Sequence, residues 1–525
     1  MQLSSNRNRC WANLIVPSLA ALLFACDSKD QRPSEVRDQA SAITIGAGAD
    51  NGPSGAFQAR LGVYPLNSNV AEPLTQVGAD FTLKPLLATR WEYRGGNTWR
   101  FHLAQNVVFH DGQKFTATAV SESMTHVARE RMGNSGLSEH SVRVVDDTTV
   151  DITPTVINLN LPFKLAHPNY SIFAPGTDPA TRPVGTGPFK WVDYKPHEQI
   201  VVERDERYRG ALPRFRKITF RFMPDANTRI LALLAGEIDL AMDLPREQIA
   251  EVNGRGGFRI ARAAPGQILA LQVNAHGKPP HDLLRDRTLR RAIAHAIDQT
   301  QLVRDMWRGE AKTVRQMTIP AILGLYADSV RGIPFDTLRS QQLLDSAGWL
   351  RTGDGTRRAR GRPLRLELVA GIEVETAAIE LIQAQLRRVG IDARVVRLAD
   401  AGAHSTRLAA GAFDLNLGIS NQNDANPLFL PALVYYSKSE RPFARWYAAG
   451  QRFDSIVELG LASADPERTR RLAAEAMRIA IDEEAVCIPV AGLFRIYAFR
   501  DDVAGFEPHP SQTNQSWASM YRKRE

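Results

Sequence analysis

The sequence predicts an α/β fold with more than one domain, and three observations support this prediction. The chain has 525 residues, which is too long for one compact core. From Ile43 onward, short apolar segments with the periodicity of strands alternate with amphipathic helical segments. Gly, Pro and Asp separate these segments, so the connections are short. Strands and helices in alternation are typical of α/β units with mixed sheets.

The first clear strand–helix pair lies near the middle of the chain. Lys217–Phe222 alternates apolar and polar residues, which predicts a half-buried strand. Asp225 is suited to cap a helix over 226–235, and Gly236 is suited to end it. A second strand is then expected over 238–242.

A second unit follows further along the chain. Leu364–Val369 alternates like a strand, a helix then ends at Gly390, and Ile391–Leu398 resumes as a strand. This order predicts a strand–helix–strand crossover of the open-sheet type. Asp465-Pro466 is a favourable start for a later helix. The crossover helix is predicted from apolar residues spaced by three, four and three: Ile379, Ile382, Leu386 and Val389.

Composition limits the class of protein. Hydrophobic residues make up 44% of the chain and charged residues 23%, as in ordinary globular proteins. The net charge of +8 raises the question of a nucleic-acid partner. The arginines are scattered, however, and the clusters at 357–360 and 387–388 lie beside a loop and a helix end, where positive charge is favourable. We therefore expect a solvated basic surface and no nucleic-acid partner.

The N-terminus resembles an export signal. Positive charge precedes an apolar stretch over Trp11–Ala25, about fifteen residues, which is too short to cross a bilayer as a helix. Such a stretch is typical of a signal-peptide core. We predict a signal peptide over 1–25 and a flexible tether over 26–40. Ala25 followed by Cys26 resembles a lipoprotein cleavage site, so we expect lipidation of Cys26 and a membrane anchor. The alternative is ordinary secretion with Cys26 as a free thiol.

The chain contains three cysteines. Cys10 would leave with the signal peptide and Cys26 would carry lipid, which leaves Cys487 within an apolar run. A lone cysteine in such a run is expected to be a small buried hydrophobic residue. No internal disulfide is possible in that mature form, so stability has to come from the packed core.

Several motifs occur in one order along most of the chain and together point to a known family. They resemble the extracytoplasmic solute-binding proteins of ABC importers, in the family that takes up peptides, nickel complexes and some oligosaccharides. The motifs are Leu-Leu-Ala-Thr-Arg-Trp-Glu at 86–92, Val-Val-Phe-His-Asp-Gly at 107–112, Val-Gly-Thr-Gly-Pro-Phe at 184–189, Leu-Arg-Arg-Ala-Ile-Ala-His-Ala-Ile-Asp at 289–298 and Gly-Ala-Phe-Asp-Leu at 411–415.

The resemblance implies a periplasmic-binding-protein-like fold of type II. Two lobes would be joined by a hinge and would close on a ligand between them. Lobe I would be discontinuous: a small α/β domain would be inserted between its first and second segments, and lobe II would lie between its second and third. The expected bounds are 41–82, 184–271 and 485–525 for lobe I, 83–183 for the inserted domain and 272–484 for lobe II.

The polar loop Ser420–Pro427 is the first candidate for a ligand site. It directly follows an apolar strand, and in open α/β proteins ligands bind at the carboxyl ends of strands. In peptide-binding relatives, an acidic residue shortly before a proline in this loop contacts the peptide's α-amino group. Asp424 resembles it but lies one residue closer to the proline than expected; Asn423 occupies the stricter position, and Asn421 lies in the same loop. An inward Asp424 would accept a charge-assisted hydrogen bond from an ammonium group. The alternative is an Asx-turn facing solvent.

A looser match to nickel-complex binders adds two residues. There, arginines of the inserted domain hold the carboxylates of the metal chelator. Arg131 falls at one such position, and His167 replaces the arginine at the other. No histidine occupies the position shortly after the 420–427 loop where a direct metal ligand would be expected, and Arg445 and Trp446 are there instead. We therefore assign no metal ligand. Arg131 as solvated surface remains an open alternative.

No motif for catalysis or for a cofactor is present: His-Glu-x-x-His, Cys-x-x-Cys, Gly-x-Ser-x-Gly and the P-loop are all missing from the sequence. We expect a monomeric binding protein of the periplasm or cell envelope that is not an enzyme and needs no cofactor. It would deliver a small polar ligand, in the first place di- or oligopeptides, to an ABC permease. The alternatives are a binder of nickel or another metal–chelator complex, and a sensory protein that signals to a receptor.

Overall fold

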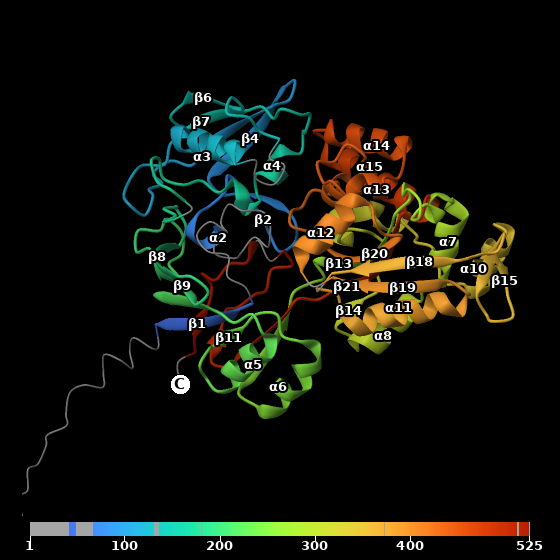
Figure 1. The fold of residues 1–525 in the computed structure, drawn as a ribbon. Coiled ribbons are helices and arrows are strands. Elements are labelled where there is room, and N and C mark those ends of the chain that lie inside the picture. Colours follow the sequence, from blue (N-terminus) through green and yellow to red (C-terminus); the bar gives the residue numbers. More distant parts are fainter. Residues whose placement is uncertain are drawn as a thin grey trace, which may run out of the picture. The chain divides into compact units, whose positions relative to one another are not determined.

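Residues 41–525 form one compact unit in the computed structural model of the chain, shown in Figure 1. Its strands fall mainly into a seven-stranded, a six-stranded and a four-stranded sheet. The structure describes residues 41–48, 67–130, 136–179, 181–371, 373–398, 400–511 and 514–523.

Four predictions concern residues outside this described part: the signal peptide over 1–25, the tether over 26–40, lipidation of Cys26, and Arg131 as a ligand contact. They stay predictions. Within the described part, no helix has the length and apolar character needed to cross a membrane.

The seven-stranded sheet forms the core of the first lobe. Its strand order is β12-β22-β11-β1-β10-β9-β8, and β1 pairs in parallel with both β10 and β11. Helices α5 (Ala226–Leu234) and α6 (Ile249–Arg255) pack against β11 and β22 through buried apolar side chains. The strands are β1 (Ala42–Ala47), β8 (Phe189–Lys195), β9 (Gln199–Arg204), β10 (Lys217–Phe222), β11 (Leu240–Ala241), β12 (Phe258–Arg262) and β22 (Ile496–Arg500).

Most local predictions in this lobe are confirmed, but the strand expected over 238–242 is limited to the two residues of β11. Strand β10 spans the predicted residues and alternates buried and partly exposed side chains. At the start of α5, the Asp225 carboxylate accepts a hydrogen bond from the Thr228 amide over 2.7 Å, as expected of an N-cap. Gly236 follows α5 with φ of 78°, a conformation that favours glycine.

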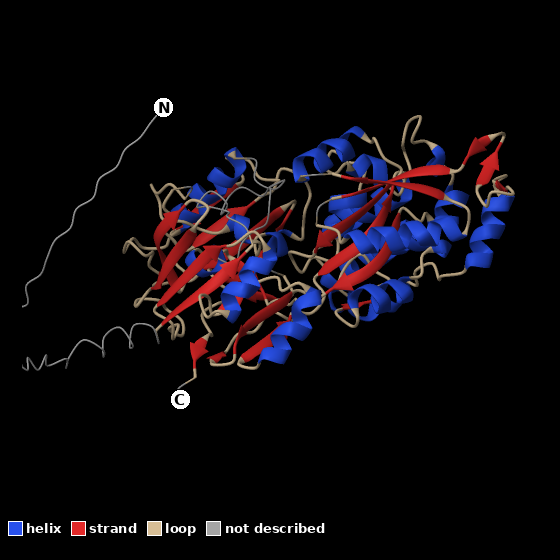
Figure 2. Cartoon of the chain, turned by 60° about the horizontal axis from the view of Figure 1, so that its bottom comes forward, coloured by secondary structure: helices blue, strands red, loops and turns tan. Residues whose placement is uncertain are grey.

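The six-stranded sheet forms the core of the second lobe, and helices pack along it (Figure 2). Strands β19, β18 and β20 pair in parallel, with α11 (Thr376–Arg388) crossing between β18 and β19, so the predicted crossover is confirmed. Strand β13 pairs antiparallel with both β20 and β21. The strands are β13 (Gln267–Val273), β14 (Ala311–Lys312), β18 (Arg365–Ala370), β19 (Asp392–Arg397), β20 (Leu415–Asn421) and β21 (Cys487–Leu493).

Other helices complete the second lobe. Cys487 is 1% exposed in β21, which confirms it as a buried, unpaired cysteine. At the far end of the lobe a small three-stranded sheet contains β15 (Leu350–Arg351), β16 (Arg357–Ala359) and β17 (Arg362–Pro363). The helices are α7 (Arg287–Ala296), α8 (Gln299–Trp307), α10 (Thr337–Ser346), α12 (Ala401–Ala410), α14 (Gln451–Leu461) and α15 (Pro466–Arg478).

The four-stranded sheet belongs to the inserted domain and packs on α3 (Ala117–Arg129) over an apolar core of its own. The domain joins the first lobe through His110, whose Nε2 lies 2.9 Å from the carbonyl oxygen of Gly187. Its strand order is β4-β5-β7-β6: β4 (Ala88–Gly95), β5 (Thr98–Leu103), β6 (Val142–Asp146) and β7 (Thr149–Ile152).

The strand pairing puts the boundaries between the two lobes at other positions than the predicted 271/272 and 484/485. Both β13 and β21 lie in the second sheet, and Leu271 pairs with Ile488. Nearly all their side chains are buried, so both strands need neighbours on either side, and the six-stranded sheet supplies them. The chain therefore crosses between the sheets at 263–266 and again at 494–495, and these two crossings form the hinge region.

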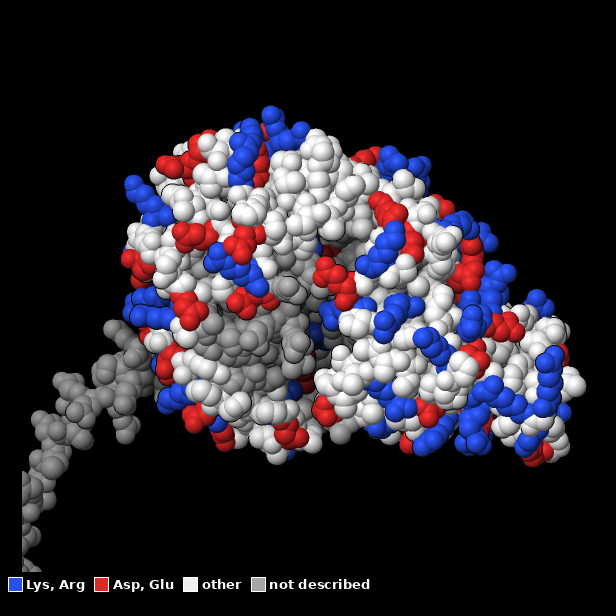
Figure 3. Space-filling view, turned by 45° about the horizontal axis from the view of Figure 1, so that its top comes forward, with Lys and Arg blue, Asp and Glu red and all other residues white. Residues whose placement is uncertain are grey.

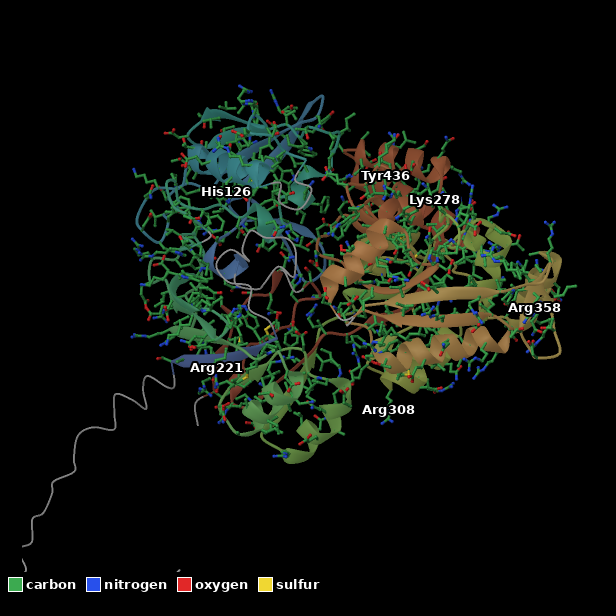
Figure 4. The ribbon with its side chains drawn as sticks, viewed as in Figure 1. His126, Arg221, Lys278, Arg308, Arg358 and Tyr436 are labelled. Atoms are coloured by element: carbon green, nitrogen blue, oxygen red, sulfur yellow. The ribbon has the colours of Figure 1, made fainter. Side chains whose placement is uncertain are left out.

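Positive charge is dispersed over the surface. Figure 4 shows Arg221 on β10, Arg308 after α8 and Arg358 on β16, in separate parts of the molecule. This distribution matches the solvated basic surface expected from the scattered arginines.

Candidate functional site

A cavity of about 400 Å³ lies between the two lobes, beside the hinge crossings. This volume is within the range of small-molecule sites. Figure 3 shows the surface hollowed between the lobes, with side chains of both charges on its rim. The first lobe contributes residues 243–246, and the crossing at the end of β21 contributes 493–496; the second lobe adds Gln267, Leu269, Trp307, Glu373, Val374, Glu375, Ala378 and Ile419.

Most charged groups of this cavity are paired. Arg246 of the first lobe lies 2.8 Å from Glu375 of the second, and the Trp307 indole donates to the same carboxylate over 3.0 Å. Arg495 pairs with Asp243 at 2.9 Å. Glu373 makes neither a hydrogen bond nor an ion pair within the described part of the chain. Among the described residues that line the cavity, three carboxylates therefore face two guanidinium groups, which leaves one surplus negative charge.

The predicted 420–427 loop begins at the edge of the cavity. Strand β20 ends at Asn421, whose side-chain oxygen accepts a hydrogen bond from Gln267 over 2.9 Å. Gln267 lines the cavity. The geometry thus connects Asn421, named from the sequence, to a cavity that the sequence did not reveal.

Buried hydrogen bonds fix the loop. Gln422 is 1% exposed; it accepts from the Thr318 hydroxyl over 2.7 Å and donates to the carbonyl oxygen of Asp424 over 2.7 Å. The carbonyl oxygen of Asn423 accepts from Ser511 and Asn514 of the C-terminal segment over 3.3 and 3.4 Å. Asn423 therefore ties the loop to the C-terminal segment through its backbone.

Asp424 is 5% exposed, so it does not face solvent. Its carboxylate accepts a hydrogen bond from the Asn426 amide over 2.8 Å, which is an Asx-turn. The sequence analysis offered two alternatives for Asp424, an inward carboxylate or an Asx-turn facing solvent. The structure has the Asx-turn, but the carboxylate is buried. Burial raises the pKa of Asp424 to about 7, while the Asn426 hydrogen bond and the positive charge of Lys164 act in the opposite direction.

The inserted domain places polar groups close to Asp424. Lys164 ends the short helix α4 (Leu161–Lys164), and burial lowers the pKa of its ammonium to about 8, against the attraction of Glu440 and Asp424. Tyr170, at the end of the 3₁₀ helix η2 (Pro168–Tyr170), is 3% exposed, and its hydroxyl has no hydrogen-bond partner within the described residues. Burial, with the negative charges of Asp424 and Glu440, raises the pKa of Tyr170. A buried hydroxyl without a partner is unusual and calls for an explanation.

His167 lies between these two groups along the chain and is half-buried. Its Nδ1 accepts a hydrogen bond from the Asn169 amide over 3.2 Å, so the proton of the neutral ring is on Nε2. Burial and the nearby charge of Lys164 lower the pKa of His167 to about 4. His167 therefore offers a neutral donor near neutral pH, where an arginine would offer a positive charge.

Contacts between the inserted domain and the second lobe enclose this polar cluster. The Leu159 amide donates to the Leu461 carbonyl over 2.7 Å, and the Asn160 side chain donates to the Gly460 carbonyl over 3.1 Å. An apolar cluster also joins Phe81 and Ala166 to Ile319, Ile322 and Ala425 of the second lobe. Within the part of the chain that the structure describes, no group of three or more His, Cys, Asp or Glu side chains is placed to hold a metal ion.

Comparisons with known proteins identify a matching family model and similar sequences. The family model of the bacterial extracellular solute-binding proteins, family 5, middle region, matches residues 82–441. The nickel-binding periplasmic protein of Escherichia coli K12 is 29% identical over 351 residues, which are 63% of this chain and 66% of that protein. The glutathione-binding protein GsiB of Salmonella typhi is 26% identical over 454 residues, 81% of this chain and 84% of that protein.

Solved structures show the same fold. NikA of Brucella suis, in complex with Fe(III)-EDTA, superimposes with a TM-score of 0.80 at 25% identity, covering 92% of this chain and all of that one (100%). DppA of Helicobacter pylori, in complex with the peptide STSA, gives 0.74 at 20% identity, covering 93% of this chain and 100% of that one. The two-lobed, type II binding-protein fold expected from the sequence is thereby confirmed.

Proposed function

The chain belongs to the bacterial extracellular solute-binding proteins of family 5, and from this premise we propose that it captures a small polar ligand for an ABC permease. Di- and oligopeptides are the first candidates. The observation that carries this proposal is the buried carboxylate of Asp424, which lies in the loop that begins at the edge of the interlobe cavity.

The local charge balance supports an ammonium group as the ligand's anchor. Asp424 and Glu440 both attract the Lys164 ammonium, and burial leaves the Asp424 carboxylate poorly solvated. A cationic ligand group at Asp424 would favour the ionised form of this carboxylate. An ammonium group at Asp424 would also have the unpartnered Tyr170 hydroxyl nearby as an acceptor. Charge-assisted hydrogen bonds of this kind are roughly twice as strong as neutral ones.

A metal–chelator complex is the second candidate, because nickel-binding proteins are among the relatives and a Fe(III)-EDTA complex is among the structural neighbours. Such a ligand presents carboxylates and needs positive groups around it. His167 is neutral near neutral pH, and Asp424 would repel a carboxylate once ionised. These two features favour the peptide over the chelator.

We further propose that the protein acts in the periplasm or cell envelope as a monomer, anchored through lipid on Cys26, and that it binds without catalysis. Family membership supports an extracytoplasmic location. Replacing Cys26 with Ser should release the protein from the membrane fraction into the soluble periplasmic fraction. An unchanged distribution would remove Cys26 as the anchor.

Calorimetric titration with paired peptides tests the ligand assignment. A tripeptide with a free α-amino group should bind, and its N-acetylated form should bind far more weakly. Asp424→Ala should weaken binding of the free-amine peptide by about 2–4 kcal/mol, since one partner of a buried charge pair is lost. The same change should leave the acetylated peptide unaffected. Equal binding of both peptides by the wild-type protein would contradict the proposed role of Asp424.

A further inference from the structure

We propose that Glu373 makes the interlobe cavity selective for ligands with a second cationic group, such as the basic side chain of a peptide. This inference rests on the proposed function, because it assigns a second charge of the ligand to the cavity at whose edge the Asp424 loop begins. The supporting observations are the charge pairing in the cavity, the position of Glu373 and the apolar wall beside it.

The two arginines of the cavity are already engaged. Arg246 contacts the Glu375 carboxylate at 2.8 Å and also donates to the Phe494 carbonyl over 3.2 Å. Arg495, whose side chain is only 12% exposed, pairs with Asp243 at 2.9 Å. The buried Nε of Arg495 has no hydrogen-bond partner among the described residues. The carboxylates of Glu375 and Asp243 nevertheless already neutralise both guanidinium groups, so the arginines offer little net positive charge to an anionic ligand.

Glu373 differs from the other carboxylates of the cavity. It lies in the turn between β18 and α11 and is exposed to solvent. No side chain or backbone group of the described residues bonds to it, whereas Asp243 and Glu375 each pair with an arginine. A cationic ligand group can therefore pair with Glu373 without breaking any interaction that the described residues make.

The wall next to Glu373 is apolar. Leu269, Val374 and Leu493 line the cavity and are buried, and Ile419 lies on the same face of the second sheet as Leu269. An aliphatic stem can pack on such a wall while its charged end reaches a carboxylate. The ligand class that fits both features is an ammonium or guanidinium group on an aliphatic chain.

The test uses three tripeptides that differ in the central side chain: Ala-Lys-Ala, Ala-norleucine-Ala and Ala-Glu-Ala. Lysine and norleucine share the aliphatic stem and differ in the charge. We expect the wild-type protein to bind the lysine peptide about tenfold more tightly than the norleucine peptide, which corresponds to about 1.4 kcal/mol. The glutamate peptide should bind most weakly.

Two variants separate the role of Glu373 from general electrostatics. Glu373→Gln should abolish the preference for lysine and leave the norleucine peptide unchanged. Glu380→Gln removes an exposed carboxylate from α11, outside the cavity lining, and should keep the preference. In the wild-type protein the preference should also shrink as salt is raised, since the charge pair is solvent-accessible.

The outcomes distinguish this inference from the proposed function. If all three peptides bind the wild-type protein equally, or if Glu373→Gln keeps the preference, the selectivity is overturned and peptide capture stands. If none of the three peptides binds, peptide capture itself is contradicted, and the selectivity falls with it.

Discussion

An Asx-turn holds the Asp424 side chain in place, and burial of the carboxyl disfavours its ionised form. Burial raises the pKa of its carboxyl to about 7, so this carboxyl titrates near neutral pH. Because an ammonium ligand binds the ionised form, ligand affinity and protonation of Asp424 are linked.

Affinity should therefore depend on pH. Between pH 5 and pH 7, wild-type affinity for a free-amine peptide should rise as Asp424 ionises, because the competing proton is lost while the peptide's own amine, with a pKa of about 8, stays charged. The same titrations on Asp424→Asn should give weak binding that does not change over this range. A wild-type affinity that is flat with pH would show that Asp424 does not titrate with the ligand.

Stability of the ligand-free protein should show the opposite trend. The pKa of Asp424 rises from 3.8 to about 7 on folding, so between these values the folded state holds a proton that the unfolded state has lost. The contribution of Asp424 is full below about pH 4 and is lost as pH rises through about 7. Urea unfolding at pH 5 and pH 8 should show a smaller loss of stability in Asp424→Asn than in the wild type. Equal losses would place Asp424 in a less buried environment.

For individual residues, the sequence predicted the local environment more successfully than it predicted which residues lie close together in the fold. The loop, the Asx-turn and the burial of Cys487 follow from local pattern. The proximity of Lys164 and Tyr170 to Asp424 does not, because these residues lie in different domains and no spacing rule connects them. The unpaired state of Glu373 likewise depends on which carboxylates the folded chain gives to Arg246 and Arg495.

At the scale of the elements, two glycines are needed where the chain returns from the inserted domain to the first lobe. Gly185 and Gly187 lie at this return, and neither has a positive φ. A Cβ on Gly185 would lie 2.1 Å from the Val70 carbonyl oxygen, and one on Gly187 would lie 2.4 Å from that of Asn69. Close backbone approach, rather than dihedral freedom, excludes a side chain.

Gly187→Ala should therefore destabilise the protein by about 1–3 kcal/mol, the usual effect of forcing an extra carbon into a packed site. Gly254→Ala is the matched control, because Gly254 lies within α6 and has open space around it. Alanine should be neutral or stabilising there. Thermal unfolding of both variants measures the difference, and equal melting temperatures would refute the close-approach argument.

An ion pair next to the hinge spans the two lobes. Arg262 of β12 binds both oxygens of Glu310, which directly precedes β14, over 2.6 Å each. Glu310→Gln should favour more open conformations by about 0.2–1 kcal/mol, as expected of a partly exposed pair. Small-angle scattering of the ligand-free protein should then give a larger radius of gyration. The control is Glu467→Gln, which removes an exposed ion pair within α15 and should leave the radius of gyration unchanged. The same radius of gyration in both variants would contradict a role of the Arg262–Glu310 pair in lobe closure.

Elements with a strong local period were predictable, and those defined by distant pairing were not. The β18–α11–β19 crossover follows from apolar spacing and a terminal glycine. Strands β13 and β21 are apolar along most of their length, so their sequences show burial without showing which sheet they join. This explains why the predicted lobe boundaries and the strand pairing differ there.

For the whole molecule, the arrangement of two sheets joined by two adjacent crossings is what makes ligand capture possible. The cavity lies beside these crossings and is lined from both lobes, so a ligand bound there contacts both. A ligand that binds only the folded state raises the melting temperature. A peptide with a free amine at one hundred times its dissociation constant should stabilise the protein by about 2.7 kcal/mol. An N-acetylated peptide should produce no shift at the same concentration.

Identification of the ligand that the protein carries when purified tests the central claim most directly. Native mass spectrometry of the mature protein gives the mass of the complex, and denaturation then releases the bound molecule for sequencing. We expect short peptides with free amino termini, enriched in lysine or arginine. A metal ion with a carboxylate chelator would contradict peptide capture and would direct attention to Arg131 and His167.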